Sequence, residues 1–351
     1  MLATRSSRSR SQVLSQQKRG AQTSAVAAPF EDSSSPVSII DMALSEEEIG
    51  DSIHHACTTS GFFIIVNHGV SEELCTNIMQ QARSLFSLSE KDKQAISVEH
   101  SDSYRGFQNM GVNVTNGELD GHEALDLISE SKRAIIPNRS ITNYGQNLWP
   151  SSLLLPDFRP TTEKYVEAMN QVGLRLMNAC SRGLGLDPSF FEPYFDDAYW
   201  SMRMIRYPGV EDASNDKDYQ FGVGEHTDYG VFTMILADSV KGTLQIRPRN
   251  TSEWIDVDPI PNGFVCNLGD MLARWSNNVY VSTPHRVMQP LKSNCGESGD
   301  RISIPFFFDP NYDSIIRPID ELVNKSENRV MFEPIMYGDH YLGKTSKNFK
   351  V

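Results

Sequence analysis

Three side chains of this 351-residue chain could together bind a metal ion: His226, Asp228 and His285. His226 and Asp228 are two positions apart, and on a β-strand such residues project from the same face. His285 is distant in the sequence, so the fold must return the chain beside the first pair. Two imidazoles and one carboxylate suit Fe(II) and leave coordination positions open for a bidentate co-substrate and dioxygen. Structural zinc sites often contain thiolates, and no cysteine accompanies either histidine.

Four short segments surround these residues: His-Thr-Asp-Tyr-Gly at 226–230, Asn-Leu-Gly-Asp-Met-Leu at 267–272, Ser-Thr-Pro-His-Arg-Val at 282–287 and Arg-Ile-Ser at 301–303. Together with Gly-Phe-Phe-Ile-Ile-Val-Asn-His-Gly-Val at 61–70, they resemble the plant- and fungal-type 2-oxoglutarate and Fe(II)-dependent dioxygenases, the superfamily that also holds isopenicillin N synthase. The resemblance covers residues 36–340. It implies that His226, Asp228 and His285 bind iron.

Arg301 and Ser303 follow His285 in the sequence, and the resemblance implies that they bind the distal carboxylate of 2-oxoglutarate. Arginine presents a rigid, charged fork that matches a carboxylate, and a hydroxyl two residues further along a strand points to the same side. The alternatives are a salt bridge at a strand end for Arg301 and a satisfied core hydroxyl for Ser303. The position after His285 favours the binding role.

The family usually carries Asn-x-Tyr-Pro-x-Cys before the first histidine, whereas this chain has Ile-Arg-Tyr-Pro-Gly-Val at 205–210. The resemblance implies that Tyr207 donates a hydrogen bond toward the co-substrate; the alternative is a strand aromatic whose hydroxyl meets solvent. Ile205 cannot replace the amide donor, and Arg203 or Arg206 are candidates to compensate. The departure leaves open an isopenicillin-N-synthase-like variant that uses no 2-oxoglutarate.

Many short apolar segments alternate with turns after Tyr199, which predicts a sandwich or barrel. The resemblance specifies a mainly β fold with flanking helices around a double-stranded β-helix, or jelly roll, that holds the iron. We expect a long helix that carries Tyr165 to Cys180 and stops at Gly183, and helices capped by Ser45 and Ser71. Strands are expected at 38–41, 62–66, 200–204, 231–236, 243–246, 254–257, 264–268 and 301–308.

The first 30 residues contain no acid before Glu31, carry several Arg and Lys residues, and are rich in Ser, Gln and Ala. This composition is typical of organellar transit peptides, and a disordered tail is the alternative. We therefore expect a cytoplasmic location, or a plastid or mitochondrial one if residues 1–35 are a transit peptide. The remaining regions are predicted as an N-terminal dioxygenase region (36–150), a long helix and connector (151–198), an Fe(II)/2-oxoglutarate jelly-roll catalytic domain (199–312) and a C-terminal extension (313–351).

Composition restricts the partners of the chain. With 39% hydrophobic residues, the chain can bury a large core as one compact catalytic unit. A net charge of −13 argues against a nucleic-acid partner, and no apolar run approaches the roughly 20 residues that cross a bilayer. The 5 scattered cysteines indicate free thiols in a reducing compartment. We expect a small-molecule substrate, with no nucleic acid, no membrane and no obligate protein partner.

A polar, glycine-containing segment at 101–121 is expected, by the resemblance, near the mouth of the pocket. Tyr104, Phe107 and His122 are therefore candidate substrate contacts. The loop at 210–222 and the tail after Asp309 are expected to line the entrance.

A second metal site is conceivable at His122, Glu123 and Asp126. On a helix, however, Glu123 would point away from the other two side chains, so we reject this site.

The expected reaction couples oxidative decarboxylation of 2-oxoglutarate to hydroxylation, or desaturation, of a small organic metabolite. The cofactors that the resemblance implies are Fe(2+), 2-oxoglutarate as co-substrate and O2, with ascorbate as a further candidate. One alternative is an oxidase of the same fold that takes its electrons from its substrate or from ascorbate. The other is a small-molecule-binding member without turnover, against which the presence of all three ligands argues.

Overall fold

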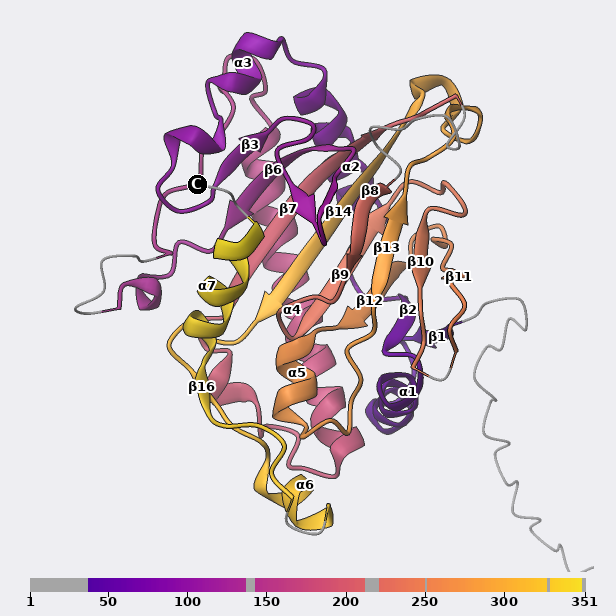
Figure 1. Cartoon of the computed structure of the whole chain (residues 1–351), viewed down its shortest axis with the longest axis vertical. Coiled ribbons are helices and arrows are strands. Elements are labelled where there is room, and N and C mark those ends of the chain that lie inside the picture. Colours follow the sequence, from indigo (N-terminus) through magenta and orange to yellow (C-terminus); the bar gives the residue numbers. More distant parts are fainter. Residues whose placement is uncertain (1–36, 137–142, 212–220, 250, 327–328, 349–351) are drawn as a thin grey trace, which may run out of the picture.

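The computed structural model describes residues 37–136, 143–211, 221–249, 251–326 and 329–348 (Figure 1). The tail or transit peptide predicted for residues 1–35 lies outside these described residues. Within them, no helix is long and apolar enough to span a membrane.

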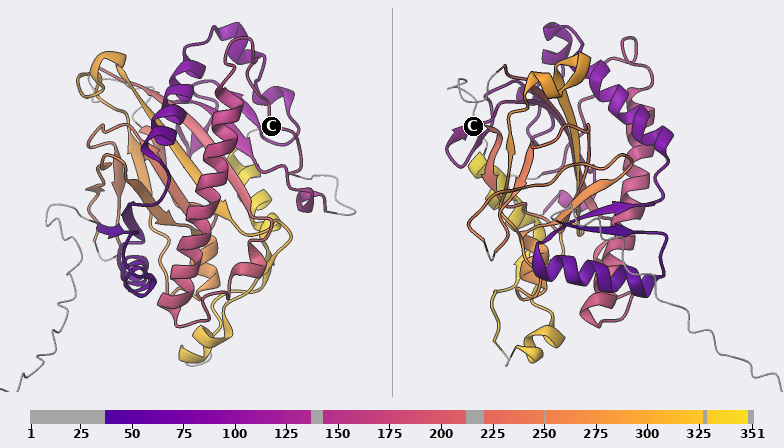
Figure 2. Two further views of the ribbon diagram at one scale, coloured as in Figure 1. Left: turned by 180° about the vertical axis from the view of Figure 1, so that it is seen from behind. Right: turned by 90° about the vertical axis from the view of Figure 1, so that its right-hand side faces the viewer.

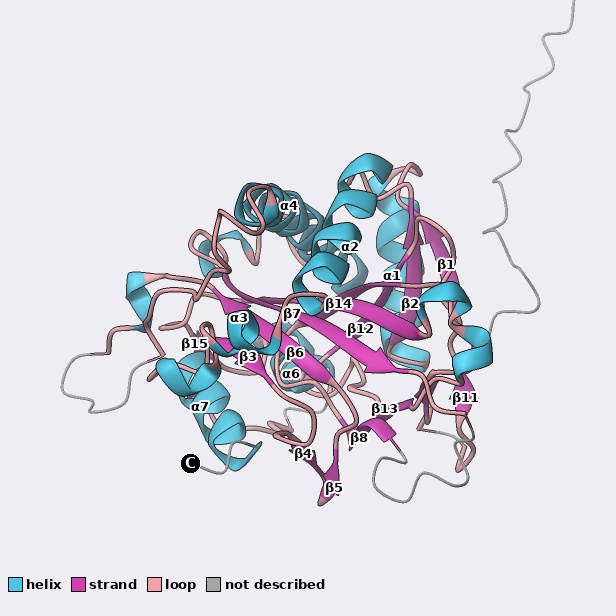
Figure 3. Cartoon of the chain, turned by 90° about the horizontal axis from the view of Figure 1, so that it is seen from above, coloured by secondary structure: helices cyan, strands magenta, loops and turns pink. Residues whose placement is uncertain are grey.

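Two β-sheets face each other in the molecule. The larger has 8 strands in the order β1 (Ser38–Asp41), β2 (Phe62–Val66), β12 (Phe264–Leu268), β9 (Phe232–Ala237), β14 (Asp300–Asp309), β7 (Tyr199–Pro208), β6 (Glu123–Ile128) and β3 (Gly106–Gln108). The smaller has 4 strands in the order β11 (Ile255–Asp256), β10 (Leu244–Ile246), β13 (His285–Met288) and β8 (Phe221–His226). Figure 3 shows the smaller sheet below one face of the larger. The predicted jelly roll with flanking helices is confirmed.

Continuous apolar runs form the central strands because both of their faces are covered. All residues of β12 are buried, and β14 is buried over most of its length between β9 and β7. Helices cover one face of these strands and the smaller sheet faces the other. The strands therefore lack the alternation of apolar and polar residues that is typical of a strand with one exposed face. The strands predicted between 38 and 66 and between 199 and 309 are present, with shifts of a few residues at their ends.

Three helices cover the outer face of the larger sheet: α1 (Glu46–Thr59), α2 (Glu72–Phe86) and α4 (Phe158–Leu184) (Figure 2). Ser45 and Ser71 begin the first two helices as predicted, and Ser45 forms a capping box with Glu48. The buried stripe of α4 includes Tyr165 and Cys180, as its apolar spacing predicted.

The prediction that α4 stops at Gly183 is wrong. The helix continues to Leu184, and Gly185 ends it with a left-handed φ of +74°. Gly183 instead allows close packing against α1, since a Cβ there would lie 2.8 Å from the Cβ of His54. A packing glycine and a terminating glycine look alike in sequence.

The helix assumed at residues 122–126 is also wrong, because this segment forms β6 in the larger sheet. Glu123 pairs with Lys93 and Arg206, whereas Asp126 pairs with Arg203 of the neighbouring strand β7. Tertiary pairing across β6 and β7 therefore decides the conformation. A second metal site at His122, Glu123 and Asp126 is still rejected, but the reason is that Glu123 and Asp126 are bound by different basic side chains.

Strands from the predicted N-terminal region, β1, β2, β3 and β6, belong to the same sheet as those of the predicted catalytic domain. The last described helix, α7 (Tyr337–Asn348), lies beside the sheets (Figure 1). The remaining elements are α3 (Glu90–Gln94), β4 (Val114–Thr115), β5 (Glu118–Leu119), α5 (Asp270–Trp275), β15 (Ile315–Ile316), α6 (Asp320–Lys325), β16 (Ile335–Met336) and short 3-10 turns at Val98–His100, Lys132–Ala134, Glu192–Tyr194, Lys292–Asn294 and Gly296–Ser298.

Candidate active site

The structure brings His226, Asp228 and His285 together between the two sheets. His226 ends β8 and pairs in register with His285 at the start of β13, so the imidazole rings are 4.2 Å apart between centroids. Oδ1 of Asp228 lies 3.6 Å from Nε2 of each histidine, and the candidate ligand atoms all lie within 4.8 Å of one another. Among the described residues, this is the only group of three or more His, Cys, Asp or Glu side chains with such a geometry.

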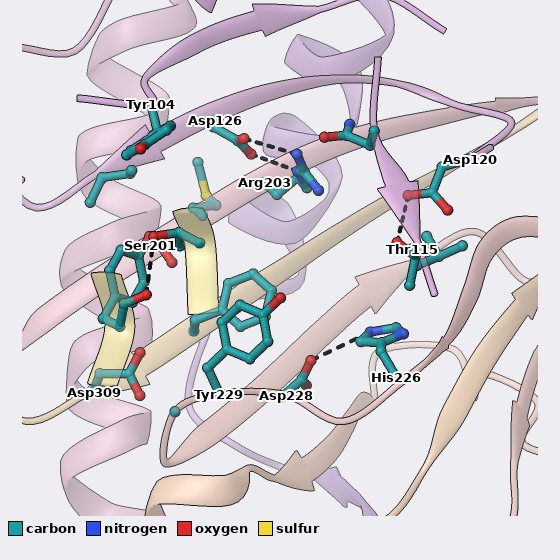
Figure 4. Close-up of a pocket in the computed structure, with 18 of the residues that line it drawn as sticks. Tyr104, Thr115, Asp120, Asp126, Ser201, Arg203, His226, Asp228, Tyr229 and Asp309 are labelled. Atoms are coloured by element: carbon teal, nitrogen blue, oxygen red, sulfur yellow. Dashed lines mark hydrogen bonds and ion pairs between the residues drawn. The ribbon is translucent and has the colours of Figure 1, made fainter. Parts of the chain in front are cut away.

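The route by which Asp228 reaches this group differs from the prediction. We expected His226 and Asp228 to share one strand, but β8 ends at His226 and Asp228 lies in the turn that follows (Figure 4). The turn, rather than the two-residue repeat of a strand, therefore brings the carboxylate to the histidines.

Both imidazoles are oriented for metal binding by a carbonyl group. Nδ1 of His226 donates to the carbonyl of Gly224 at 2.8 Å, and Nδ1 of His285 donates to that of Thr283 at 3.1 Å. A carbonyl can only accept, so each proton is placed on Nδ1 and each Nε2 keeps a free lone pair. Burial, followed by the neighbouring His285, lowers the pKa of His226 and favours the neutral, ligating form.

Two neighbouring strands orient the carboxylate of Asp228. Asn267 of β12 and Thr233 of β9 are paired in register, and they donate to Oδ2 of Asp228 at 2.6 and 2.5 Å. Oδ1 remains for a metal ion. Burial alone would raise the pKa of Asp228, but His285, His226 and these hydrogen bonds bring it below its ordinary value. Sequence reasoning missed Thr233; a hydroxyl within the otherwise apolar β9 was the available signal.

This arrangement predicts that Thr233→Val and Asn267→Ala weaken Fe(II) binding without removing a ligand. Loss of an orienting partner of this kind typically costs about 10- to 100-fold in metal affinity. Competition with a fluorescent chelator under anaerobic conditions would measure the dissociation constant. Thr59→Val, an exposed position on α1, serves as the matched control. Wild-type affinity in both site variants would contradict an orienting role.

Arg301 and Ser303 lie side by side on β14, with Tyr207 opposite Arg301 on β7. Arg301 is 3% and Ser303 4% exposed. Within the described residues, Nε and Nη1 of Arg301 have no hydrogen-bond partner, although its guanidinium lies 5.2 Å from the centre of the Tyr207 ring. Burial lowers the pKa of Arg301 and raises that of Tyr207 to about 12. Unpaired buried donors are costly, and a carboxylate would satisfy them.

The position of the missing family asparagine forms part of an apolar wall. Ile205 is buried in a cluster with Tyr207 and Leu244. Arg206 does not compensate, because its guanidinium is held by Glu123 at 2.8 Å and by Asp300 at 2.7 Å. Met202, Met204 and Arg206 occupy alternate positions of β7 and therefore lie on the same face of the strand. Met202 and Met204 belong to the core cluster that also contains residues of the helices, so Arg206 lies on the helix-covered face of the sheet.

A cavity opens beside the candidate metal ligands His226 and Asp228 (Figure 4). Tyr104 lines it, as expected, and so do Tyr341 and Thr345 of α7, which belong to the tail after Asp309. The other part of the expected entrance, residues 212–220 of the loop, lies outside the described residues.

Two of the three predicted substrate contacts are not cavity residues among those described. Phe107 is fully buried in the hydrophobic core, 5.1 Å from the ammonium of Lys93. His122 is also buried, and its Nδ1 is held by the carbonyl of Gly222 at 2.7 Å. Both predictions rested on the expected position of this region near the mouth of the pocket, whereas pairing of β3 with β6 draws Phe107 inside.

Asp309, at the end of β14, was not predicted as a site residue. It is 3% exposed, lines the cavity and accepts a hydrogen bond from the amide of Val231 at 2.7 Å. Burial raises its pKa to about 7, and the charge of Asp228 adds to the shift. A Cβ at Gly230 would overlap the Asp309 carboxylate, so the glycine after Tyr229 was an indirect signal.

The raised pKa predicts a pH-dependent stability change. A carboxyl with a pKa of about 7 when folded and 3.8 when unfolded binds more protons in the folded state between these values, so it lowers the free energy of unfolding as the pH rises. We expect Asp309→Asn to stabilise the protein by roughly 2–4 kcal/mol at pH 8, with the gain shrinking toward pH 4. Urea unfolding at both pH values measures it. Asp51→Asn, on the exposed side of α1, should give no such gap.

Comparison with known proteins assigns the family. Residues 37–152 match the model described as non-haem dioxygenase in morphine synthesis N-terminal, and residues 199–310 match that of the 2OG-Fe(II) oxygenase superfamily. A homoarginine-6-hydroxylase of Glycine max is 34% identical over 305 residues, covering 86% of this chain and 89% of that protein.

Solved structures agree with the sequence comparison. A full-length Neurospora crassa protein in complex with alpha-KG has a TM-score of 0.74 at 26% identity, over 88% of this chain and 96% of that one. JOX2 in complex with 2OG, Fe and JA has a TM-score of 0.71 at 29% identity, over 88% of this chain and 84% of that one. This chain therefore belongs to the 2OG-Fe(II) oxygenase superfamily and is a 2-oxoglutarate-dependent dioxygenase.

Proposed function

We propose that His226, Asp228 and His285 bind the catalytic Fe(II) of this dioxygenase, which hydroxylates or desaturates a small organic molecule. The observation that carries the proposal is the convergence of the three ligand atoms within 4.8 Å beside a cavity. The donor set of two neutral imidazoles and one carboxylate fits a ferrous ion with open positions. Bound Fe(II) and 2-oxoglutarate supply the oxidising power, as dioxygen is reduced, 2-oxoglutarate becomes succinate and CO2, and the organic substrate is oxidised.

The co-substrate is proposed to lie against Arg301, Ser303 and Tyr207. The unpaired Nε and Nη1 of Arg301 would donate to the distal carboxylate, which the Ser303 hydroxyl would also contact. Apolar side chains such as Ile205 and Leu244 would cover its hydrocarbon chain. These unpaired donors support 2-oxoglutarate over the alternative of an oxidase without it, and the complete ligand set supports turnover over binding alone.

The protein contributes orientation and a partly dry environment. Asn267 and Thr233 hold Asp228 so that only one oxygen faces the metal position. Phe62 packs edge-on against His285, with ring centroids 5.3 Å apart, and limits water around that ligand. Fixed ligands and excluded water direct the oxidation to the bound substrate rather than to solvent.

The relatives leave the substrate open. The Glycine max relative is named for homoarginine, the Neurospora crassa protein binds thymine in one structure, and JOX2 is seen with JA. We propose a freely diffusing small-molecule substrate here, with no nucleic acid, membrane or obligate protein partner. The net charge of −13 supports the exclusion of nucleic acid.

Anaerobic protein loaded with Fe(II) and 2-oxoglutarate provides the test. On addition of O2, we expect succinate to form, and a metabolite mixture should yield one compound whose mass gains one oxygen or loses two hydrogens. Omission of Fe(II) or of 2-oxoglutarate is the control. Oxygen consumption without succinate would instead establish an oxidase that does not use 2-oxoglutarate.

A further inference from the structure

The charges that line the substrate cavity do not balance. Besides the metal ligand Asp228, the described lining contains the carboxylates of Asp120, Asp126 and Asp309, against the single guanidinium of Arg203. Arg203 is already engaged, since its Nε and Nη2 bind Asp126 at 2.7 and 3.0 Å. The cavity therefore presents more negative than positive charge to a substrate.

Asp120 and Asp309 are the two carboxylates that lack a salt bridge among the described residues. Asp120 is 2% exposed and accepts hydrogen bonds from Thr115 Oγ1 at 2.7 Å and from the Gly224 amide at 3.2 Å. Asp309 is equally buried and accepts from the Val231 amide. Neutral donors only partly offset the burial of a carboxylate, so two such groups beside one cavity are costly without a cationic partner.

Other charges near the cavity do not offset these carboxylates. Lys344 of α7 binds Asp270 at 2.8 Å instead. In the proposed site, the formal charges of Fe(II), Asp228, 2-oxoglutarate and Arg301 cancel one another. Burial raises the pKa of both Asp120 and Asp309; at Asp120, hydrogen bonds and the charges of Arg203 and His226 act in the opposite direction but offset only part of the effect of burial.

Figure 4 places the two carboxylates at different sides of the cavity, with Tyr229 and Asp228 between them. A substrate that contacts both must therefore extend past the metal ligands. Aromatic rings of Tyr104, Tyr229 and Tyr341 also line the cavity, and aromatic faces attract organic cations.

We propose that this cavity selects a substrate with positively charged groups at two ends, a basic amino acid or a diamine, held by Asp120 and Asp309. The inference rests on the proposed oxygenase function and specifies its substrate class. One cationic group would pair with each carboxylate, and the carbon chain between them would lie beside the metal. A compound that lacks one of the two positive groups would leave one carboxylate buried without a cationic partner, which is the source of the discrimination.

Pairs of amino acids that differ in the charge of the side chain test the charge requirement. L-arginine is compared with L-citrulline, and L-lysine with L-norleucine, on protein loaded with Fe(II) and 2-oxoglutarate. Calorimetry without oxygen measures binding, and succinate release with oxygen measures stimulated turnover. We expect each cation to bind about tenfold or more tightly than its neutral partner. Equal or tighter binding of the neutral partners, or no binding advantage for either cation, would overturn the proposal.

Variants assign the effect to the two carboxylates. Asp120→Asn and Asp309→Asn should each reduce the affinity for L-arginine and L-lysine about tenfold or more, while the KM for 2-oxoglutarate stays the same. The variant that removes the partner of the side-chain cation should leave the affinity for L-citrulline and L-norleucine unchanged, whereas the variant that removes the partner of the α-ammonium group should lower it as well. Glu163→Gln, exposed on α4, is the matched control. If one variant does not fold, the other still decides, since unchanged cation affinity in a folded variant rejects its carboxylate as the binding group.

Different results would reject the oxygenase function and the cation site. Succinate formed slowly without any organic substrate reports the oxygenase function alone. Cation-selective binding without succinate under any condition would reject the proposed function and retain the cation site. Succinate formation stimulated only by neutral compounds such as thymine would retain the function and reject the cation site.

Discussion

Replacing His226 with alanine is expected to reduce succinate formation to the background of metal-free protein. The imidazole supplies one of the three ligands, and its Nε2 lies 3.6 Å from the Asp228 carboxylate with which it would share the ion. Two remaining ligands bind Fe(II) too weakly to retain it, so both metal content and turnover are lost together. Metal analysis after dialysis and succinate quantification on the same sample would measure this.

The effect must be separated from misfolding. His55→Ala, on the exposed side of α1, is the matched control and should keep wild-type iron content and turnover. The circular dichroism spectrum and thermal midpoint of metal-free His226→Ala should match those of metal-free wild type. Full succinate formation in a folded His226→Ala protein would remove His226 from the metal site.

Replacing Arg301 with methionine is expected to raise the KM for 2-oxoglutarate about 10- to 150-fold. A buried dicarboxylate would lose a charge-assisted hydrogen-bonded pair worth about 1.5–3 kcal/mol, and Arg301 is only 3% exposed. Arg301→Lys keeps the charge but not the planar fork, so its KM should lie between those of the wild type and the methionine variant. Initial rates of succinate formation across a 2-oxoglutarate series give each KM.

Two comparisons make this result interpretable. Arg159→Met, exposed on α4, should leave the KM unchanged. Iron content of the Arg301 variants should remain at the wild-type level, because Arg301 is not a metal ligand. An unchanged KM in folded Arg301→Met would reject the anchor and favour an oxidase that uses no 2-oxoglutarate.

Local features of the fold could be predicted from the sequence because they depend on near neighbours. The capping box at Ser45 and the buried run of β2 are formed by residues within a few positions of one another. The strand at β6 could not be predicted, since its conformation follows from pairing with β3 and β7. The same limit explains why Phe107 was wrongly expected to contact the substrate.

The candidate site also combines residues that could be predicted from the sequence with residues that only the fold brings together. The residues His226, Asp228, His285 and Arg301 could be selected from their types and order, and the structure brings the first three together. Asp120 and Asp309 could not, because they are more than 180 positions apart and line the same cavity only once the chain has folded. Nothing in their local sequence distinguishes them from surface aspartates.

The position of α7 has a consequence for the biosynthesis of the enzyme. Tyr341 and Thr345 form part of the cavity wall, and they follow the candidate metal ligands and both sheets in the chain. A ribosome therefore makes the jelly roll first and this wall afterwards. A nascent chain that has been synthesised as far as β14 contains all the candidate iron ligands. Its substrate cavity lacks the side formed by α7 until translation has passed Thr345.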